Sequence, residues 1–196
     1  MVIQVITPPA ASLLTAADTV LRQHLHLEAD ESDQDELVSD FCAAAQSKIE
    51  NEIRQYLQTQ TIRLTSSGHS FRGARGFALE VSPITSISRV AYLGQDGAEI
   101  VLPDEEYRLH QTEIPNLLLT AREGYWPADM TASEEVRIDL EVGFEGVVAG
   151  IPRELIAAIR FLVAYWLINR EVASESGFEE MPHMVTSMIT PHIFWF

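Results

Sequence analysis

The spacing of apolar residues changes twice along the chain, and this change limits the possible folds more than any other feature of the sequence. Between residues 38 and 58 apolar side chains recur at steps of three and four, which predicts an amphipathic helix. Between residues 61 and 142 the period falls to two, most clearly over residues 136–142, as in half-buried antiparallel strands. From residue 152 to 171 the pattern is helical again and apolar on nearly every side, which is typical of a helix buried in a core or between subunits.

These changes predict an α+β fold. Helices from both chain ends are expected to pack together, with an antiparallel all-β insertion, a small sandwich or barrel, between them. We place the N-terminal helical segment at residues 1–60, the β insertion at 61–149, and the C-terminal helix with an extended tail at 150–196. The first and last of these segments are expected to form one helical unit. Within the insertion we expect strands near residues 62–65, 77–81, 87–93, 99–102, 107–110, 116–120 and 136–142.

Two shorter helices are expected beside the long ones. Thr15 and Asp18 resemble a capping box for a helix that runs to about Leu27, and Ser32 is placed to cap the helix that follows. Near the C-terminus a last short helix is expected before Pro191. Its apolar residues would face one way: Met181, Met184, Val185, Met188 and Ile189.

Charge and composition exclude several functional classes. The chain has 196 residues and a formal net charge of −16, from 29 acidic and 13 basic side chains. Such a surface repels phosphate backbones and anionic lipid, which argues against a protein that reads DNA sequence. The apolar stretch 155–168 is interrupted by Arg160 and is shorter than the ~20 residues of a membrane span. Because Cys42 is the single cysteine and residues 1–10 lack a signal-peptide pattern, we expect no disulfide within the chain and synthesis in a reducing cytoplasm.

No residue pattern points to catalysis. The sequence contains no GxSxG, P-loop, GxGxxG or HExxH motif, so we expect no enzyme activity, no cofactor and no metal site. His24 and His26 would point to different sides of a helix, and we interpret them as surface histidines. The acidic run 28–36 lacks the calcium-loop pattern and is interpreted as a solvated helix start. Cys42 is interpreted as inert packing on the apolar side of its helix.

The segment 66–76, "SSGHSFRGARG", is the one stretch rich in both glycine and arginine. Its backbone amides, together with Arg72 and Arg75, form a candidate phosphate cradle and a candidate contact with DNA or a neighbouring subunit. The interpretation we favour is a long mobile hairpin loop.

The chain finishes on "TPHIFWF", an unusual run of aromatic residues. Pro191 is expected to separate it from the preceding helix, so that it extends as an arm able to add to a partner's sheet edge or fill a partner's groove. Folding back onto the same subunit is the alternative. We expect deletion of residues 191–196 to leave the monomer folded and to weaken attachment to a partner, whereas loss of the thermal transition would assign the tail to the core.

The order of several stretches is familiar. The opening "ITPPAASLLTAADTVLRQHLHLEADESDQDEL" is followed by an Ala-rich helix; "VSPITSISRVAYLGQDGAEIVLPDEEYRL" gives a strand pair; "WPADMTASEEVRIDLEVGF" gives a further strand; and "IPRELIAAIRFLVAYWLINRE" gives the long helix. Over nearly its full length the chain resembles the tailed-phage head–tail connector (adaptor) proteins, including prophage and gene-transfer-agent relatives. It departs from the family where "YLQTQ" replaces a glycine-containing turn and where Phe144 replaces a tyrosine.

The resemblance implies a structural protein of the phage neck, made in the bacterial host cytoplasm. Family members form a ring, commonly of twelve subunits, between the portal protein and a tail-side neck protein, a stopper or tail terminator. Double-stranded DNA passes through the ring without specific contact, and an acidic subunit suits such a conduit. The resemblance also implies subunit contacts on the C-terminal helix, for which we single out Ile159, Phe161, Tyr165 and Trp166. It implies portal contacts in the tail, formed by Pro191, His192, Ile193, Phe194, Trp195 and Phe196.

Two alternatives remain open at this level. The first is a tail-completion or stopper protein, which the sequence does not distinguish well from an adaptor. A ligand-binding or hydrolytic β-domain protein would use acids such as Glu105, Glu106 and Asp139, and would require a pocket with convergent polar groups.

Overall fold

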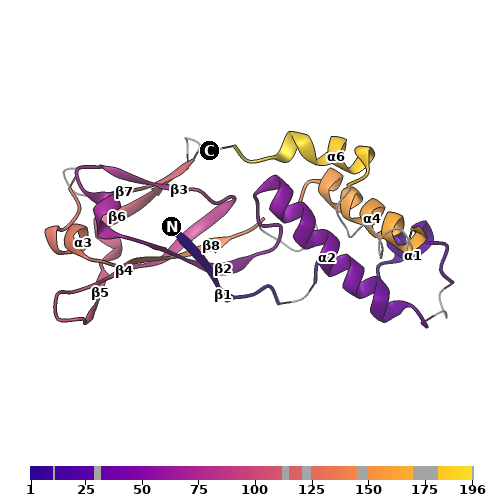
Figure 1. The fold of residues 1–196 in the computed structure, drawn as a ribbon, viewed down its shortest axis with the longest axis horizontal. Coiled ribbons are helices and arrows are strands. Elements are labelled where there is room, and N and C mark those ends of the chain that lie inside the picture. Colours follow the sequence, from indigo (N-terminus) through magenta and orange to yellow (C-terminus); the bar gives the residue numbers. More distant parts are fainter. Residues whose placement is uncertain are drawn as a thin grey trace. The chain divides into compact units, whose positions relative to one another are not determined.

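A computed structural model describes residues 1–10, 12–28, 32–111, 115–120, 125–144, 150–169 and 181–195. The chain forms two compact units (Figure 1). The sheet unit consists of Met1–Pro9, Gln58–Phe144 and Trp195–Phe196, and the helical unit consists of Ala10–Leu57 and Glu145–Phe194. Among the described residues, no helix has both the length and the hydropathy needed to cross a membrane.

The sheet unit contains two antiparallel sheets. The first has five strands in the order β1-β2-β8-β4-β5, and the second has three strands in the order β3-β7-β6. The strand bounds are β1 Val2–Thr7, β2 Gln60–Ser66, β3 Gly76–Leu79, β4 Ile84–Leu93, β5 Glu99–Leu102, β6 Tyr107–His110, β7 Asn116–Thr120 and β8 Val136–Val142. Among the described strands neither sheet closes on itself, so the sandwich alternative describes this unit better than the barrel.

One face of the five-stranded sheet supplies much of the core. In antiparallel pairing, residues directly opposite one another point to the same face. Leu64 of β2 lies opposite Ile138 of β8, which in turn lies opposite Val90 of β4, and all three side chains are fully buried. From the smaller sheet, Leu79 and Leu118 are also fully buried.

Short helical turns close the sheet unit. The 3₁₀ turn η1 (Gly68–Phe71) buries Phe71, whose ring stacks on Phe77 at 4.4 Å and meets Trp126 edge-on at 5.4 Å. Helix α3 (Ala128–Ala132) lies against η1, and a second 3₁₀ turn, η2 (Asp104–Glu106), precedes β6. Gly68 sits so close to α3 that a Cβ would lie 2.1 Å from the carbonyl oxygen of Met130.

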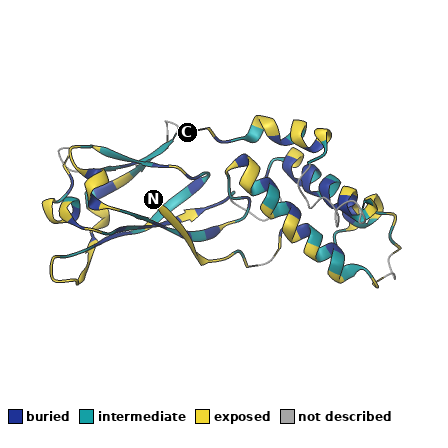
Figure 2. Ribbon diagram, in the orientation of Figure 1, coloured by how far each residue is buried: buried dark blue, intermediate teal, exposed yellow. Residues whose placement is uncertain are grey.

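The helical unit brings together segments from both ends of the chain. Its elements are α1 (Thr19–His24), α2 (Asp35–Ile53), α4 (Arg153–Ile168), α6 (His183–Ile189) and the 3₁₀ turn η4 (Thr190–His192). Helix α4 packs against α2, α6 and α1. The dark stripes of Figure 2 mark the buried faces: Val38, Cys42, Ala45, Ile49 and Ile53 on α2, and Leu155, Ile159, Leu162 and Trp166 among those on α4.

The fold class is confirmed: the protein is α+β, with antiparallel sheets formed by the middle of the chain. Several boundaries differ from the predicted ones. Residues 2–7, which we expected in the N-terminal helical segment, form strand β1 and pair with β2. Helix α2 ends at Ile53 rather than near Gln58, because Arg54 adopts a left-handed conformation with φ of 56° and its N–H closes the last turn on the carbonyl of Glu50.

Helix starts differ in a similar way. Asp18 caps α1 by accepting a hydrogen bond from the Leu21 N–H at 2.7 Å. Ser32 does not cap α2; the residue before the helix is Gln34, which makes no side-chain cap bond. On α6 only Val185 and Ile189 of the expected apolar face are buried, whereas Met184 is 48% exposed. Residues 170–180, which connect α4 to α6, lie outside the described residues.

Candidate functional site

The C-terminal tail is docked on its own helical unit as far as Phe194. Pro191 lies inside the turn η4 rather than ending the helical structure. A proline is tolerated there because an N–H in the first turn of a helix has no hydrogen-bond partner within the helix. Beyond it, the Phe194 N–H donates to the carbonyl of Ile53 at 2.8 Å, and Gln55 Nε2 donates to the carbonyl of His192 at 2.5 Å. The Ile53 carbonyl is one of those that a helix end leaves without an intrahelical donor.

The tail therefore differs from the free arm that we expected from the sequence. Phe194 is 9% exposed and belongs to the buried residues, while Ile193 and His192 are half-buried. Trp195 alone among the described aromatic tail residues projects from the surface, at 70% exposed. Phe196 lies outside the described residues.

The predicted subunit contacts on α4 do not form one surface. Ile159 and Trp166 are buried in the core of their own unit, and the Trp166 ring lies 6.0 Å from that of Phe41. Phe161 is half-buried against His24, with ring centroids 4.9 Å apart. Only Tyr165, at 38% exposed, remains available on the surface. The helix is apolar on most sides because α1, α2 and α6 all pack on it.

The loop that carries Arg72 and Arg75 is held in place by its own backbone. The N–H of Gly68 donates to the carbonyl of Ser133 at 3.0 Å, and those of Ser70, Arg72 and Ala74 donate to carbonyls within the loop. Because these amides are already bonded, they do not form the phosphate cradle that the sequence offered as a candidate. With Phe71 buried beneath it, the segment is also an anchored turn rather than a long mobile loop. Arg72 and Arg75 are not buried.

The acids proposed for a catalytic alternative do not converge. Glu105 and Glu106 lie on the turn η2, whereas Asp139 is on β8, 8% exposed and bound to Arg63. A cavity of about 440 Å³ lies elsewhere, between the β4–β5 hairpin and α3. Its lining does not include Glu105, Glu106 or Asp139. In the described part of the chain, no group of His, Cys, Asp or Glu side chains is arranged to hold a metal ion.

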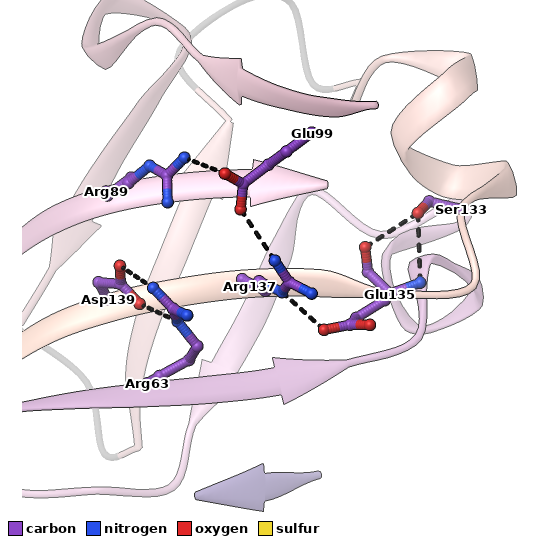
Figure 3. Close-up of polar contacts among 7 residues, drawn as sticks. All are labelled: Arg63, Arg89, Glu99, Ser133, Glu135, Arg137 and Asp139. Atoms are coloured by element: carbon purple, nitrogen blue, oxygen red, sulfur yellow. Dashed lines mark hydrogen bonds and ion pairs between the residues drawn. The ribbon is translucent and has the colours of Figure 1, made fainter. Parts of the chain in front are cut away.

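A ladder of ion pairs covers the outer face of the five-stranded sheet (Figure 3). Arg63 of β2 donates from Nε and Nη2 to the two carboxylate oxygens of Asp139, at 2.7 and 2.9 Å. Glu99 of β5 accepts from Arg89 at 2.5 Å and from Arg137 at 3.0 Å, and Arg137 also donates to Glu135 at 2.6 Å. The hydrogen bond from Arg89 lowers the pKa of Glu99 from its usual value.

This ladder was not predicted from the sequence. Its members come from strands β2, β4, β5 and β8, and Glu135 directly precedes β8. These strands lie in separate parts of the sequence, and only their pairing register brings the members together. The consequence for function is that these arginines are neutralised within the subunit. Arg72 and Arg75 are therefore better placed than the ladder to meet a phosphate.

Strand β1 is the most exposed apolar element of the sheet unit. Every residue of Val2–Thr7 is exposed, as the yellow strand of Figure 2 shows, and the strand carries no charged side chain. Ile3 and Val5 pair with Leu64 and Ile62, so they continue the core-facing side of the sheet. Yet they are 43% and 46% exposed, whereas their partners are fully buried.

The sequence matches no protein-family model and no curated protein. Comparison with solved structures finds the same fold in chains of gene transfer agent (GTA) particles. A chain in the neck of the empty GTA particle, computed with C6 symmetry, and a chain in the virion of the native GTA particle each match with a TM-score of 0.79 at 22% identity. A chain in the neck of the native particle, computed with C12 symmetry, matches with a TM-score of 0.75 at 20% identity. Each match covers 100% of this chain and 97% of the other, so the whole fold is shared with chains of these particles.

Proposed function

We propose that this protein is a structural subunit of the neck of a tailed-phage or gene-transfer-agent particle, and within the neck a head–tail adaptor. It forms a ring, of twelve subunits, between the portal protein and a tail-side neck protein, and double-stranded DNA passes through the ring. The observation that carries the proposal is the match of the complete fold, at 100% coverage of this chain and 97% of its counterpart, to chains in GTA necks.

Surface chemistry supports a conduit for DNA. The net charge of −16 gives repulsion that lets a polyanion slide without being held. Three arginines that could hold phosphate, Arg63, Arg89 and Arg137, are bound to carboxylates of the same sheet. In the described residues the acids of the catalytic alternative are dispersed, so we propose a structural rather than an enzymatic role, without a cofactor.

The tail contributes one candidate portal contact. Because Phe194 is buried in the helical unit and Ile193 is half-buried, we assign the contact to Trp195, which is 70% exposed. A large exposed aromatic ring is the kind of residue that anchors interfaces.

The test is reconstitution with portal rings. The purified protein is mixed with portal rings from the same particle, and the complex is examined by native mass spectrometry and electron microscopy. Rings of this protein stacked on the portal are expected. A protein that leaves the portal unoccupied at high concentration overturns the adaptor role. Binding only to the tail-side neck protein would identify a stopper instead.

A further inference from the structure

Among the described strands, the five-stranded sheet ends at β1 on one side and at β5 on the other, and both edge strands carry exposed apolar side chains. On β1 the exposed fractions are 66% for Val2 and 46% for Val5; on β5 they are 40% for Ile100 and 51% for Val101. An open edge with apolar side chains and free backbone groups is a site for pairing with another strand. Proteins usually protect such edges with charged side chains, but no side chain from Met1 to Pro9 is charged.

The two edges also match each other face by face. Ile3 continues a row of paired residues that crosses the sheet through Leu64, Ile138 and Val90 to Leu102 on the core-facing side. Val2 continues a second row, through Thr65, Arg137 and Ala91 to Val101, on the outer side. If β5 of a second copy paired with β1 of the first, the sheet would continue from one copy to the next. Apolar residues would then lie beside apolar residues on both faces of the joined sheet.

The direction of the strands fixes the type of junction. Each neighbouring pair in the order β1-β2-β8-β4-β5 is antiparallel, so in this five-stranded sheet the two edge strands run in the same direction. In a ring with many subunits, each copy is related to the next by a small rotation. The strands of neighbouring copies therefore run in nearly the same direction. Adjacent copies would thus meet in parallel pairing, whereas a two-fold dimer through β1 alone would be antiparallel.

Charge favours a second copy as the occupant of this edge. Each chain carries a net charge of −16, so two copies repel one another over most of their surface. β1 brings no acid to the contact, and Glu99, the one charged residue of β5, is already bound to Arg89 and Arg137. The strands are short, six and four residues, so one junction buries less than the roughly 1,600 Å² of a standard interface. A single junction would therefore be weak, and closure of the ring would add to the stability of each junction.

We propose that β1 of one subunit pairs in parallel with β5 of the next, so that the five-stranded sheets join from subunit to subunit. The inference rests on the proposed ring, whose head-to-tail contacts join different surfaces of each subunit. It assigns the contact to Val2, Ile3 and Val5 on one side and to Ile100 and Val101 on the other.

Cysteine cross-linking of the full-length chain tests the junction. Val2→Cys and Val101→Cys proteins are made separately, mixed at high concentration and treated with a bis-maleimide that spans about 10 Å, since paired strands lie ~4.8 Å apart. The native Cys42 is buried, and burial raises its pKa to about 11, so it is a poor target for the reagent. A Ser47→Cys protein, altered at a position of α2 that is not fully buried, measures random collision.

We expect the V2C and V101C mixture to give several-fold more cross-linked dimer than either protein alone or the Ser47→Cys control. Dimers of V2C with itself, without the mixed product, would mean a two-fold contact through β1 and would overturn the proposal. A yield no greater than that of the Ser47→Cys control would also overturn it.

Ring assembly on the portal separates this inference from the proposed function. Val2→Lys places a charge on the outer side of the exposed edge, where Val2 is 66% exposed and the fold should tolerate it, and is expected to prevent ring formation. Complete portal-bound rings of the Val2→Lys protein would overturn the junction and leave the neck function standing. A V2C–V101C product from a protein that never binds the portal would support the junction and count against the neck function.

Discussion

Arg160 on α4 donates to both carboxylate oxygens of Asp18, 142 residues earlier, at 3.2 and 3.0 Å. Asp18 is also the N-cap of α1, and its Oδ1 accepts the Leu21 N–H at 2.7 Å. One carboxylate thus caps a helix from the N-terminal side of the chain and fixes it to a helix from the C-terminal side. The two sides of the ion pair are each a little over one-fifth exposed, at 22% and 23%.

Replacing Asp18 should separate its two roles. Asp18→Ala removes the cap, worth about 1 kcal/mol, and leaves the Arg160 guanidinium without this partner, so a total loss of roughly 2 kcal/mol in the free energy of unfolding is expected. Asp18→Asn keeps an oxygen for the cap and should lose less. Urea denaturation measures both, with Asp40→Asn on the exposed side of α2 as the control. Equal losses for the two Asp18 variants would contradict this division.

A double-mutant cycle should detect the pair between Arg63 and Asp139. The two residues lie opposite each other in the register of β2 and β8, and both carboxylate oxygens accept from the guanidinium. The side chains are 27% and 11% exposed, so the pair is less screened than a fully exposed surface pair. We expect Arg63→Met and Asp139→Asn to destabilise individually and the cycle to give a coupling of about 1 kcal/mol. Additive losses would show that the pair contributes no coupling.

Glu50 on α2 is expected to make stability depend on pH. Burial raises the pKa of its carboxyl, against the lowering effects of the Leu57 N–H and the Gln46 side chain. A raised pKa means that the folded state binds the proton more tightly than the unfolded state. The contribution is therefore complete below the unfolded-state pKa and is lost as pH rises through the folded-state pKa.

Glu50→Gln keeps an oxygen for the Leu57 N–H, which lies 2.9 Å from the carboxylate, and removes the ionisation. Its thermal midpoint should exceed that of the wild type by more at about pH 7.5 than at about pH 4, because the wild-type carboxyl pays for its buried charge only where it is ionised. The comparison at each pH cancels the titration of the other groups. A difference that is independent of pH, or larger under the acidic condition, would contradict the raised pKa.

Gly143 should tolerate no side chain. Its φ is 106°, and a Cβ would lie 2.1 Å from the carbonyl oxygen of Gln58. Gly97 provides a matched control, because its φ is 78° but nothing lies within 4 Å of a Cβ there. Gly97→Ala should cost about 1 kcal/mol from backbone strain, whereas Gly143→Ala should cost more than ~2 kcal/mol or prevent folding. Similar thermal midpoints for the two variants would exclude the close contact as the cause.

The regular elements of this fold follow from local sequence. Strands over 99–102, 107–110, 116–120 and 136–142 were predicted with the bounds that the structure has. Alternation of apolar and polar residues, which records one buried face, is clearest over residues 136–142. Strand β1 was missed because it is apolar on both faces and pairs with β2, about sixty residues away. Its sequence therefore lacks the alternation by which strands are recognised.

The irregular elements depended on contacts that spacing does not encode. The end of α2 at Ile53 is set by the left-handed Arg54, at a position where no glycine gave a signal. The ion-pair ladder required the register of strands far apart in sequence, such as the pairing of Arg63 with Asp139. The docking of Phe194 depended on the free carbonyl that this helix end exposes. Each of these features is a consequence of tertiary structure rather than of local propensity.

The tail gives the sharpest separation of folding from assembly. Phe194 is buried and its N–H is bonded to the carbonyl of Ile53, so deletion of residues 191–196 is expected to lower the thermal midpoint of the helical unit. Phe194→Ala should reproduce most of that loss, about 2–3 kcal/mol for a largely buried phenyl ring. A truncated protein that melts like the wild type would instead restore the free arm that the sequence alone favoured.

Trp195→Ala is the variant to compare with Phe194→Ala, because Trp195 follows Phe194 in the chain but is 70% exposed. Its stability should stay within ~0.5 kcal/mol of the wild type, since little buried surface is lost. Its binding to portal rings, measured by pulldown at matched concentrations, should weaken if the indole fills a pocket on the portal, as we propose. Unchanged portal binding with unchanged stability would remove the tail from the interface. The opposite pattern, a large loss of stability in Trp195→Ala, would mean that the indole serves the subunit's own fold.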